Sequence, residues 1–126
     1  MKVVKSAAVA EPRGPYSQGL LIDSGKKWLY LSGQVAVDRD GAIPEGIEQQ
    51  SRLVWDNIET LLGEAGMAVP NIVKVTTYLT SADFMPGFGA VRAECLAAHR
   101  PASTLLIVSE LANPKFLVEV DIVAAS

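Results

Sequence analysis

The chain has 126 residues, 49% of them hydrophobic and 20% charged, which excludes a disordered protein and suffices for the core of one domain. Its formal charge of −3 and isoelectric point of about 5.1 argue against nucleic-acid binding, because lysines and arginines must neutralise the phosphates. No apolar run approaches the roughly 18 residues of a membrane span.

The cysteine content and the opening segment indicate a reducing compartment. Cys95 is the only cysteine, so the chain cannot form an internal disulfide. The opening MKVVKSAAVAEP is interrupted by Lys5, and its apolar stretch is too short for a signal peptide. We therefore expect a cytoplasmic protein with neither a membrane nor a nucleic acid as partner.

The mean hydropathy of +0.25 is high for so small a chain. A small domain has little interior, so part of this apolar surface is expected to lie in an interface between subunits. A well-packed monomer is the alternative.

Three strands are predicted before the first helix, over residues 3–10, 16–23 and 27–37. Aromatic and β-branched residues favour the third of them, and Gly33 interrupts it. A loop is expected over residues 38–46.

The strongest signal is an amphipathic helix after this loop. Apolar residues recur along it at intervals of three and four: Ile47, Val54, Ile58, Leu61, Leu62 and Ala65. Gly66 directly after this stripe is typical of a helix end.

A strand rich in β-branched residues is predicted over residues 72–80, followed by a second helix. Asp83 is expected to cap this helix, and Pro101 marks its end. The apolar face of the helix would carry Phe84, Phe88, Val91 and Cys95.

Two further strands are predicted, over residues 103–111 and 116–125. The order of elements is therefore βββαβαββ, which predicts an α+β fold with one mixed sheet and two helices on one of its faces. The opposite face would remain bare, which again indicates the assembly of several copies.

The sequence lacks the motifs of several common sites. Neither the glycine-rich phosphate loop nor the dinucleotide-binding pattern is present. With one histidine and one cysteine, a zinc or other transition-metal site is not expected.

Two glycine-containing motifs could bind a small ligand. GPYSQG, residues 14–19, places Tyr16 in a loop entering a strand, where the ring could contact a ligand or simply cover a turn. SGQ, residues 32–34, places Gly33 inside a strand, which permits close approach of a ligand or of another backbone, or marks a bulge.

Polar side chains in the last two strands are further candidates. In LVEVDIVA, residues 117–124, the alternation places Glu119 and Asp121 on one face. A carboxylate between apolar neighbours can act as a general base or acid, although a half-solvated strand or an ion pair with a lysine explains the pattern as well. Ser103 and Thr104 could position a water or a carboxylate, or satisfy a turn.

The fragment HRPASTLLIV, residues 99–108, brings the only histidine and an arginine to the start of a strand. His99 is expected to end the second helix, where a protonated imidazole interacts favourably with the last carbonyls. No nucleophile elbow is present to suggest a Ser–His–Asp triad.

GPYSQG, SGQ, PAST and LVEVDIVA occur together and in this order, over essentially the whole chain. This combination resembles the Rid family, also called YjgF/YER057c/UK114. The resemblance implies one domain over residues 1–126 with the chorismate-mutase-like form of the βββαβαββ fold. It also implies a homotrimer with small-molecule clefts between its subunits.

In the best-studied branch of that family, the enzyme hydrolyses enamine and imine intermediates, such as 2-aminoacrylate, without a cofactor. The resemblance implies that Glu119 is the catalytic acid, which activates water or transfers the proton. It further implies that Tyr16 closes over the ligand and that Gly33 offers backbone hydrogen bonds.

The sequence departs from that branch at its substrate-binding positions. Ser103 stands where an arginine would grip the substrate carboxylate, and Leu105 where a cysteine is frequent. An expected asparagine falls on Phe88 or Gly89. Losing the guanidinium is expected to weaken the binding of a 2-imino acid by roughly 2–4 kcal/mol. Arg100 is the nearest residue that could compensate.

The function expected is therefore hydrolysis of an enamine, an imine or a related nitrogen compound, with altered or weak specificity and with Ser103 lining the pocket. A non-catalytic ligand-binding or regulatory protein on the same scaffold is the alternative. A ribonuclease or translation inhibitor is disfavoured by the acidic charge balance.

Overall fold

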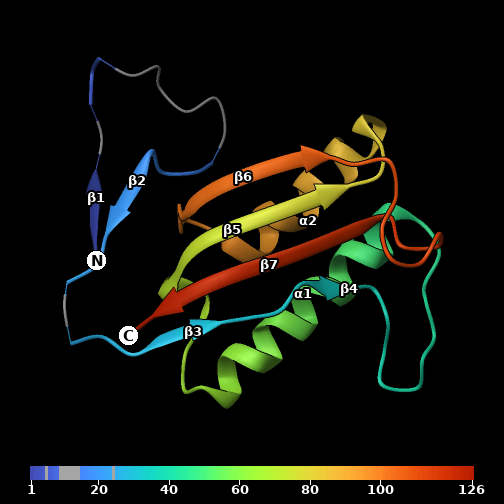
Figure 1. Ribbon diagram of the computed structural model, residues 1–126, viewed down its shortest axis with the longest axis horizontal. Coiled ribbons are helices and arrows are strands. Elements are labelled where there is room, and N and C mark those ends of the chain that lie inside the picture. The colour runs from blue at the N-terminus through green and yellow to red at the C-terminus, as the bar shows by residue number, and fades with distance from the viewer. Residues whose placement is uncertain (5, 9–14, 24) are drawn as a thin grey trace.

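A computed structural model of the chain describes residues 1–4, 6–8, 15–23 and 25–126 (Figure 1). Its main sheet has five strands, whose order across the sheet is β3–β7–β5–β6, with β4 also paired to β7. The strands are β3 (Trp28–Tyr30), β4 (Gln34–Val35), β5 (Ile72–Leu79), β6 (Ala102–Ile107) and β7 (Val118–Ala125). The β5–β6 pair is parallel and the other pairs are antiparallel, so the sheet is mixed, as predicted.

Two helices, α1 (Ile47–Glu64) and α2 (Met85–Leu96), lie on one side of this sheet (Figure 1). The α+β class, both helices and the shared face are confirmed. The helix α1 ends where the sequence predicts, because Gly66 takes a positive φ of 69° directly after the capping residue Ala65.

The core lies between the sheet and the helices. Along β7, buried residues alternate with half-buried ones, so Val118, Val120 and Ile122 face the helices. The largest fully buried side chains are Trp55, Phe88, Ile58, Leu62, Ile72, Leu79 and Ile122. Glu119 and Asp121 therefore share the open face of the sheet, as the alternation predicts.

The start of α2 differs from the prediction. Asp83 does not cap the helix; instead, the hydroxyl of Ser81 accepts a hydrogen bond from the backbone N–H of Asp83 at 3.2 Å. This contact begins a single 3₁₀ turn, Ala82–Phe84, and α2 follows at Met85 with a proline in its first turn.

The expectation of one sheet is wrong for the first two strands. β1 (Lys2–Val4) and β2 (Gly19–Leu21) pair with each other as a separate two-stranded sheet, which Figure 1 shows beside the main one. An isolated parallel bridge from Ser17 to Ala102, at the start of β6, connects the segment before β2 to the main sheet.

The third predicted strand is divided into β3 and β4 by a bulge. Tyr30 lies opposite Val123 and Gln34 opposite Val120, so four steps along one strand match three along the other. Gly33 lies in the extra length, which agrees with the interpretation of this glycine as the mark of a bulge.

Apolar side chains remain exposed at both edges of the main sheet. Trp28 and Tyr30 stack on each other on β3, with ring centroids 6.5 Å apart, and Tyr30 is 72% exposed. On β6, at the opposite edge, the exposed apolar residues are Leu105, Leu106 and Ile107. Over the described residues, no helix is long and apolar enough to cross a membrane.

Candidate functional site

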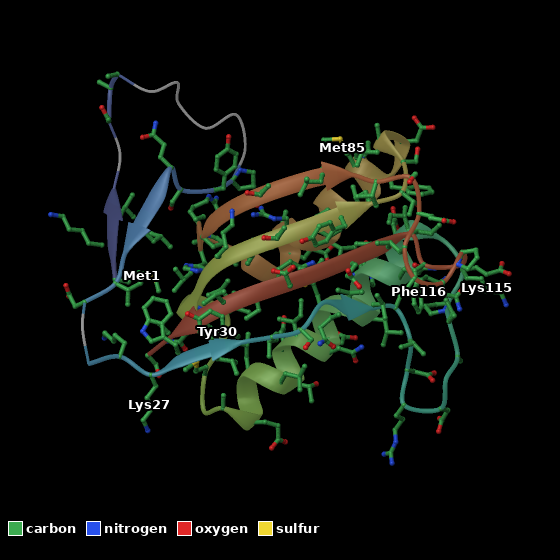
Figure 2. All side chains as sticks on the ribbon, viewed as in Figure 1. Met1, Lys27, Tyr30, Met85, Lys115 and Phe116 are labelled. Atoms are coloured by element: carbon green, nitrogen blue, oxygen red, sulfur yellow. The ribbon has the colours of Figure 1, made fainter. Side chains whose placement is uncertain are left out.

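Tyr16 and Ser103 line one cavity of about 460 Å³ at the β6 edge of the sheet. The helix α2 forms its other wall with Phe88, Gly89 and Arg92. Figure 2 shows Met85, a further lining residue, beside β6. The structure thus brings together two of the predicted site residues.

The loop with Tyr16 is held to β6 by its neighbour Ser17. The backbone N–H of Ser17 donates to the carbonyl of Pro101 at 2.9 Å, and its hydroxyl donates to the carbonyl of Arg100. These contacts fix the loop two residues before Ser103 and so place Tyr16 over the cavity. Gly14, at the start of the GPYSQG motif, lies outside the described residues.

Gly33 and Glu119 form a second group, on the open face of the sheet. A Cβ atom at position 33 would lie 2.8 Å from the carboxyl carbon of Glu119. This is closer than real Cβ contacts, so the carboxylate occupies space that only a glycine leaves free. Gly33 thus permits a close approach, but the group that approaches is the Glu119 side chain, neither a ligand nor another backbone.

The two groups lie on opposite faces of the sheet. Ser103 is in register with Val75, which is buried beneath the helices. Glu119 is in register with Tyr78, on the alternate face of β5. One copy of the chain therefore does not bring the four predicted residues into a single site.

The open face around Glu119 is acidic. The Asp121 carboxylate, which is hydrogen-bonded to Tyr78, raises the pKa of that phenol; burial and then the charge of Glu119 raise it further. Lys74 is opposite Val123 on the same face, and its ammonium donates to the hydroxyl of Thr104 at 2.5 Å. The face thus has groups that can donate and accept protons.

His99 and Arg100 do not enter the cavity. His99 Nε2 lies 2.7 Å from the carbonyl of Ile72, so the imidazole ties the end of α2 to β5. The contact with helix-end carbonyls that we expected of His99 is made by Arg100, whose Nη1 donates to the carbonyl of Ala97 at 2.7 Å. The Arg100 guanidinium is thus hydrogen-bonded at the end of α2 and does not line the cavity with Ser103.

The sequence analysis missed Arg92. This side chain is only 8% exposed, lines the cavity beside Ser103, and donates from Nη1 to the carbonyl of Pro15 at 3.2 Å. Burial lowers the pKa of its guanidinium, and the charge of Arg100 lowers it further. The available signal was its spacing of four residues from Phe88, which places both side chains on one helix face.

The described part of the chain has no cluster of three or more histidine, cysteine, aspartate or glutamate side chains that could hold a metal ion.

The profile of the family described as Endoribonuclease L-PSP matches residues 6–126. A RutC family protein of Pyrococcus horikoshii is 32% identical over 126 residues, covering 98% of this chain and 96% of its own length. This chain belongs to the Rid/YjgF family. The family prediction is therefore confirmed.

A solved structure and a further sequence relative also match this chain over most of its length. A protein of unknown function of the Rid family from Yersinia pestis superposes with a TM-score of 0.85 at 26% identity, covering 99% of this chain and 98% of that one. The Schizosaccharomyces pombe protein mmf2 is 32% identical over 114 residues, which cover 89% of this chain and 88% of its own length. Its name places mmf2 in the mitochondrion, so the cytoplasmic location of this Rid protein stays a prediction.

Proposed function

We propose that this Rid protein hydrolyses a small enamine or imine at sites between the subunits of a homotrimer. The observation that carries the proposal is the packing of the Glu119 carboxylate against Gly33, on a face that also holds Tyr78 and Asp121. A carboxylate packed in this way, with no ion pair to a lysine or arginine in the described part of the chain, is suited to general acid–base work.

The division of the site into two halves supports a site shared between copies. In each copy, Tyr16 and Ser103 line a cavity at the β6 edge, and Glu119 lies on the opposite face. A second copy that places its open face against this edge would join the two halves. The same contact would cover the exposed side chains of β6, which a lone domain leaves in water.

The proposed reaction needs no group beyond the side chains and water. Water adds to the carbon of the C=N bond while Glu119 accepts a proton from it. Glu119 returns this proton to the nitrogen, which gives a carbinolamine. Glu119 then carries the proton of the new hydroxyl group to the nitrogen as the C–N bond breaks, so ammonia departs and a carbonyl product remains. An enamine enters the same route once its carbon has gained a proton and its nitrogen has lost one, which gives the imine.

Substrate selection is assigned to the cavity. Ser103 supplies a hydroxyl and no charge, and Phe88 and Gly89 supply no amide. This Rid protein should therefore select its substrate differently from enzymes that hold the carboxylate with an arginine at that strand position.

The test is the release of keto acid and ammonia from freshly generated 2-aminoacrylate and 2-iminobutanoate. Wild type should exceed the uncatalysed rate, and Glu119→Gln should lower turnover by about a hundredfold or more, the usual contribution of a general acid or base. Full activity of Glu119→Gln would remove Glu119 from the mechanism.

A non-catalytic ligand-binding protein is the second candidate. The specific observation in its favour is that Ser103, Phe88 and Gly89 replace polar or charged substrate-binding groups within one cavity. This candidate predicts that a metabolite raises the melting temperature without being consumed.

A further inference from the structure

We infer that Arg92 is the anion-binding residue of the cavity and that the ligand of this Rid protein bears a carboxylate, which Arg92 holds from the α2 side. The inference deepens the proposed function by naming the substrate class, and it rests on that function only for the identity of the reaction.

The first observation is an unsatisfied buried charge. Arg92 is nine-tenths buried, and its Nη2 has no hydrogen-bond partner within the described part of the chain. The other terminal nitrogen is engaged, since Nη1 donates to Pro15. An arginine remains charged even in such a setting, and an unpaired buried charge destabilises a protein. Such groups therefore call for a partner, and the described part of the chain does not supply one.

The second observation is the cavity that the Arg92 side chain lines. Arg92 lines the same cavity of about 460 Å³ as Ser103 and Tyr16, so two hydroxyl groups accompany the guanidinium. Gly89 lies three residues earlier on α2, and a Cβ atom at this position would meet nothing within 4 Å. The small residues at positions 89 and 103 leave room for a ligand group next to Arg92.

The third observation is the sign of the local charge. Arg100 lies close enough to lower the pKa of Arg92, so two cations share this end of α2. The ion pair found among the described residues joins Arg52 and Glu94 and uses neither of them. A carboxylate fits this site because its oxygens can accept from a guanidinium and from a hydroxyl together.

The experiment is calorimetric titration with 2-oxobutanoate and with its neutral amide, 2-oxobutanamide. Wild type should bind the carboxylate better than the amide. Arg92→Met should bind the carboxylate roughly tenfold to a hundredfold more weakly, the range of a charged hydrogen bond, and should lose the preference over the amide. The matched control is Arg100→Met, which removes the neighbouring cation and should stay within a few-fold of wild type.

Three results would overturn the inference. They are unchanged affinity of Arg92→Met, equal binding of the two probes by wild type, and no binding of 2-oxobutanoate at millimolar concentrations. If Arg92→Met does not fold, the inference is tested on wild type by recording the nuclear magnetic resonance signals of the arginine guanidinium groups during the same titrations. They should shift with the carboxylate and not with the amide, and the absence of a shift would equally contradict the inference.

The variant Glu119→Gln distinguishes a failure of this inference from a failure of the proposed function. Glu119→Gln removes a negative charge from the shared site and leaves Arg92 in place, so its affinity for 2-oxobutanoate should not fall below that of wild type. Loss of turnover without loss of binding in that variant supports both claims. Full turnover in Glu119→Gln removes the proposed mechanism and leaves the assignment of Arg92 standing.

Discussion

Gly33 and Glu119 lie 86 positions apart in the sequence, yet a Cβ atom at position 33 would lie 2.8 Å from the carboxyl carbon of Glu119 and 3.1 Å from its Oε1. The backbone at Gly33 does not require a positive φ, so the need for glycine comes from this contact rather than from local strain. The position of the proposed catalytic carboxylate is therefore set by a bulge between β3 and β4.

Gly33→Ala should therefore lower activity far more than stability. The added methyl group meets the end of a flexible side chain, which can move away, so the melting temperature should change by no more than a few degrees. The displaced carboxylate should reduce turnover by about tenfold or more. Ser32→Ala is the control for a change in the same loop. Equal turnover in wild type and Gly33→Ala would show that the contact does not matter for function.

The phenol of Tyr78 should titrate at higher pH than an ordinary tyrosine. The charge of Asp121, then burial, then a hydrogen bond to Asp121 raise its pKa above the ordinary value of about 10. The neutral phenol is thus favoured in the fold. This contribution to stability is fully present below about pH 10 and is lost as the pH rises through the folded-state pKa.

The difference in absorbance at 295 nm between wild type and Tyr78→Phe, followed against pH, isolates this titration. Asp121→Asn should move it to lower pH, because the variant removes the main cause of the shift. An unmoved titration in Asp121→Asn would show that another group controls Tyr78.

Cys95 should react slowly with thiol reagents at neutral pH. Burial above all, helped by the charges of Glu59, Asp56 and Glu94, raises the pKa of its thiol to about 11. The alkylation rate of the folded protein should rise with pH up to that value, and the unfolded protein should react faster at pH 7.5. Rapid alkylation of the folded protein at neutral pH would contradict this environment.

Two glycines of α2 offer a matched test of packing. Gly89→Ala should stabilise the protein by about 0.5–1 kcal/mol, because alanine is the better helix former and its Cβ meets nothing within 4 Å. Gly87→Ala should lower the melting temperature, because its Cβ would lie 2.8 Å from Cγ2 of Ile47 on α1. Thermal unfolding of the two variants measures both effects. An unchanged or raised melting temperature of Gly87→Ala would contradict the close contact between Gly87 and Ile47.

The sequence predicted those elements whose signals are local. The apolar stripe of α1 is long and regular, and its end at Gly66 follows from one backbone requirement. The alternation in β7 correctly assigned Glu119 and Asp121 to one face, because a strand has a period of two.

Other features depend on partners distant in the chain, and local patterns do not report these. The sequences of the short strands β1 and β2 do not show which strands they pair with, so their separation from the main sheet was not predicted. Arg92 resembles an ordinary helix-surface cation in the sequence. Its burial depends on Pro15 and β6, which are distant in the sequence and pack near it in the fold.

The central claim is that the site is shared between copies, and mixed oligomers test it most directly. Glu119→Gln removes the proposed acid, and Gly89→Leu fills the cavity from a position whose Cβ has free space. Each variant alone should be nearly inactive. Random assembly from an equal mixture should restore about one quarter of the sites, because an intact cavity and an intact Glu119 then come from different copies. A mixture no more active than the separate variants would place both halves within one chain and contradict the account.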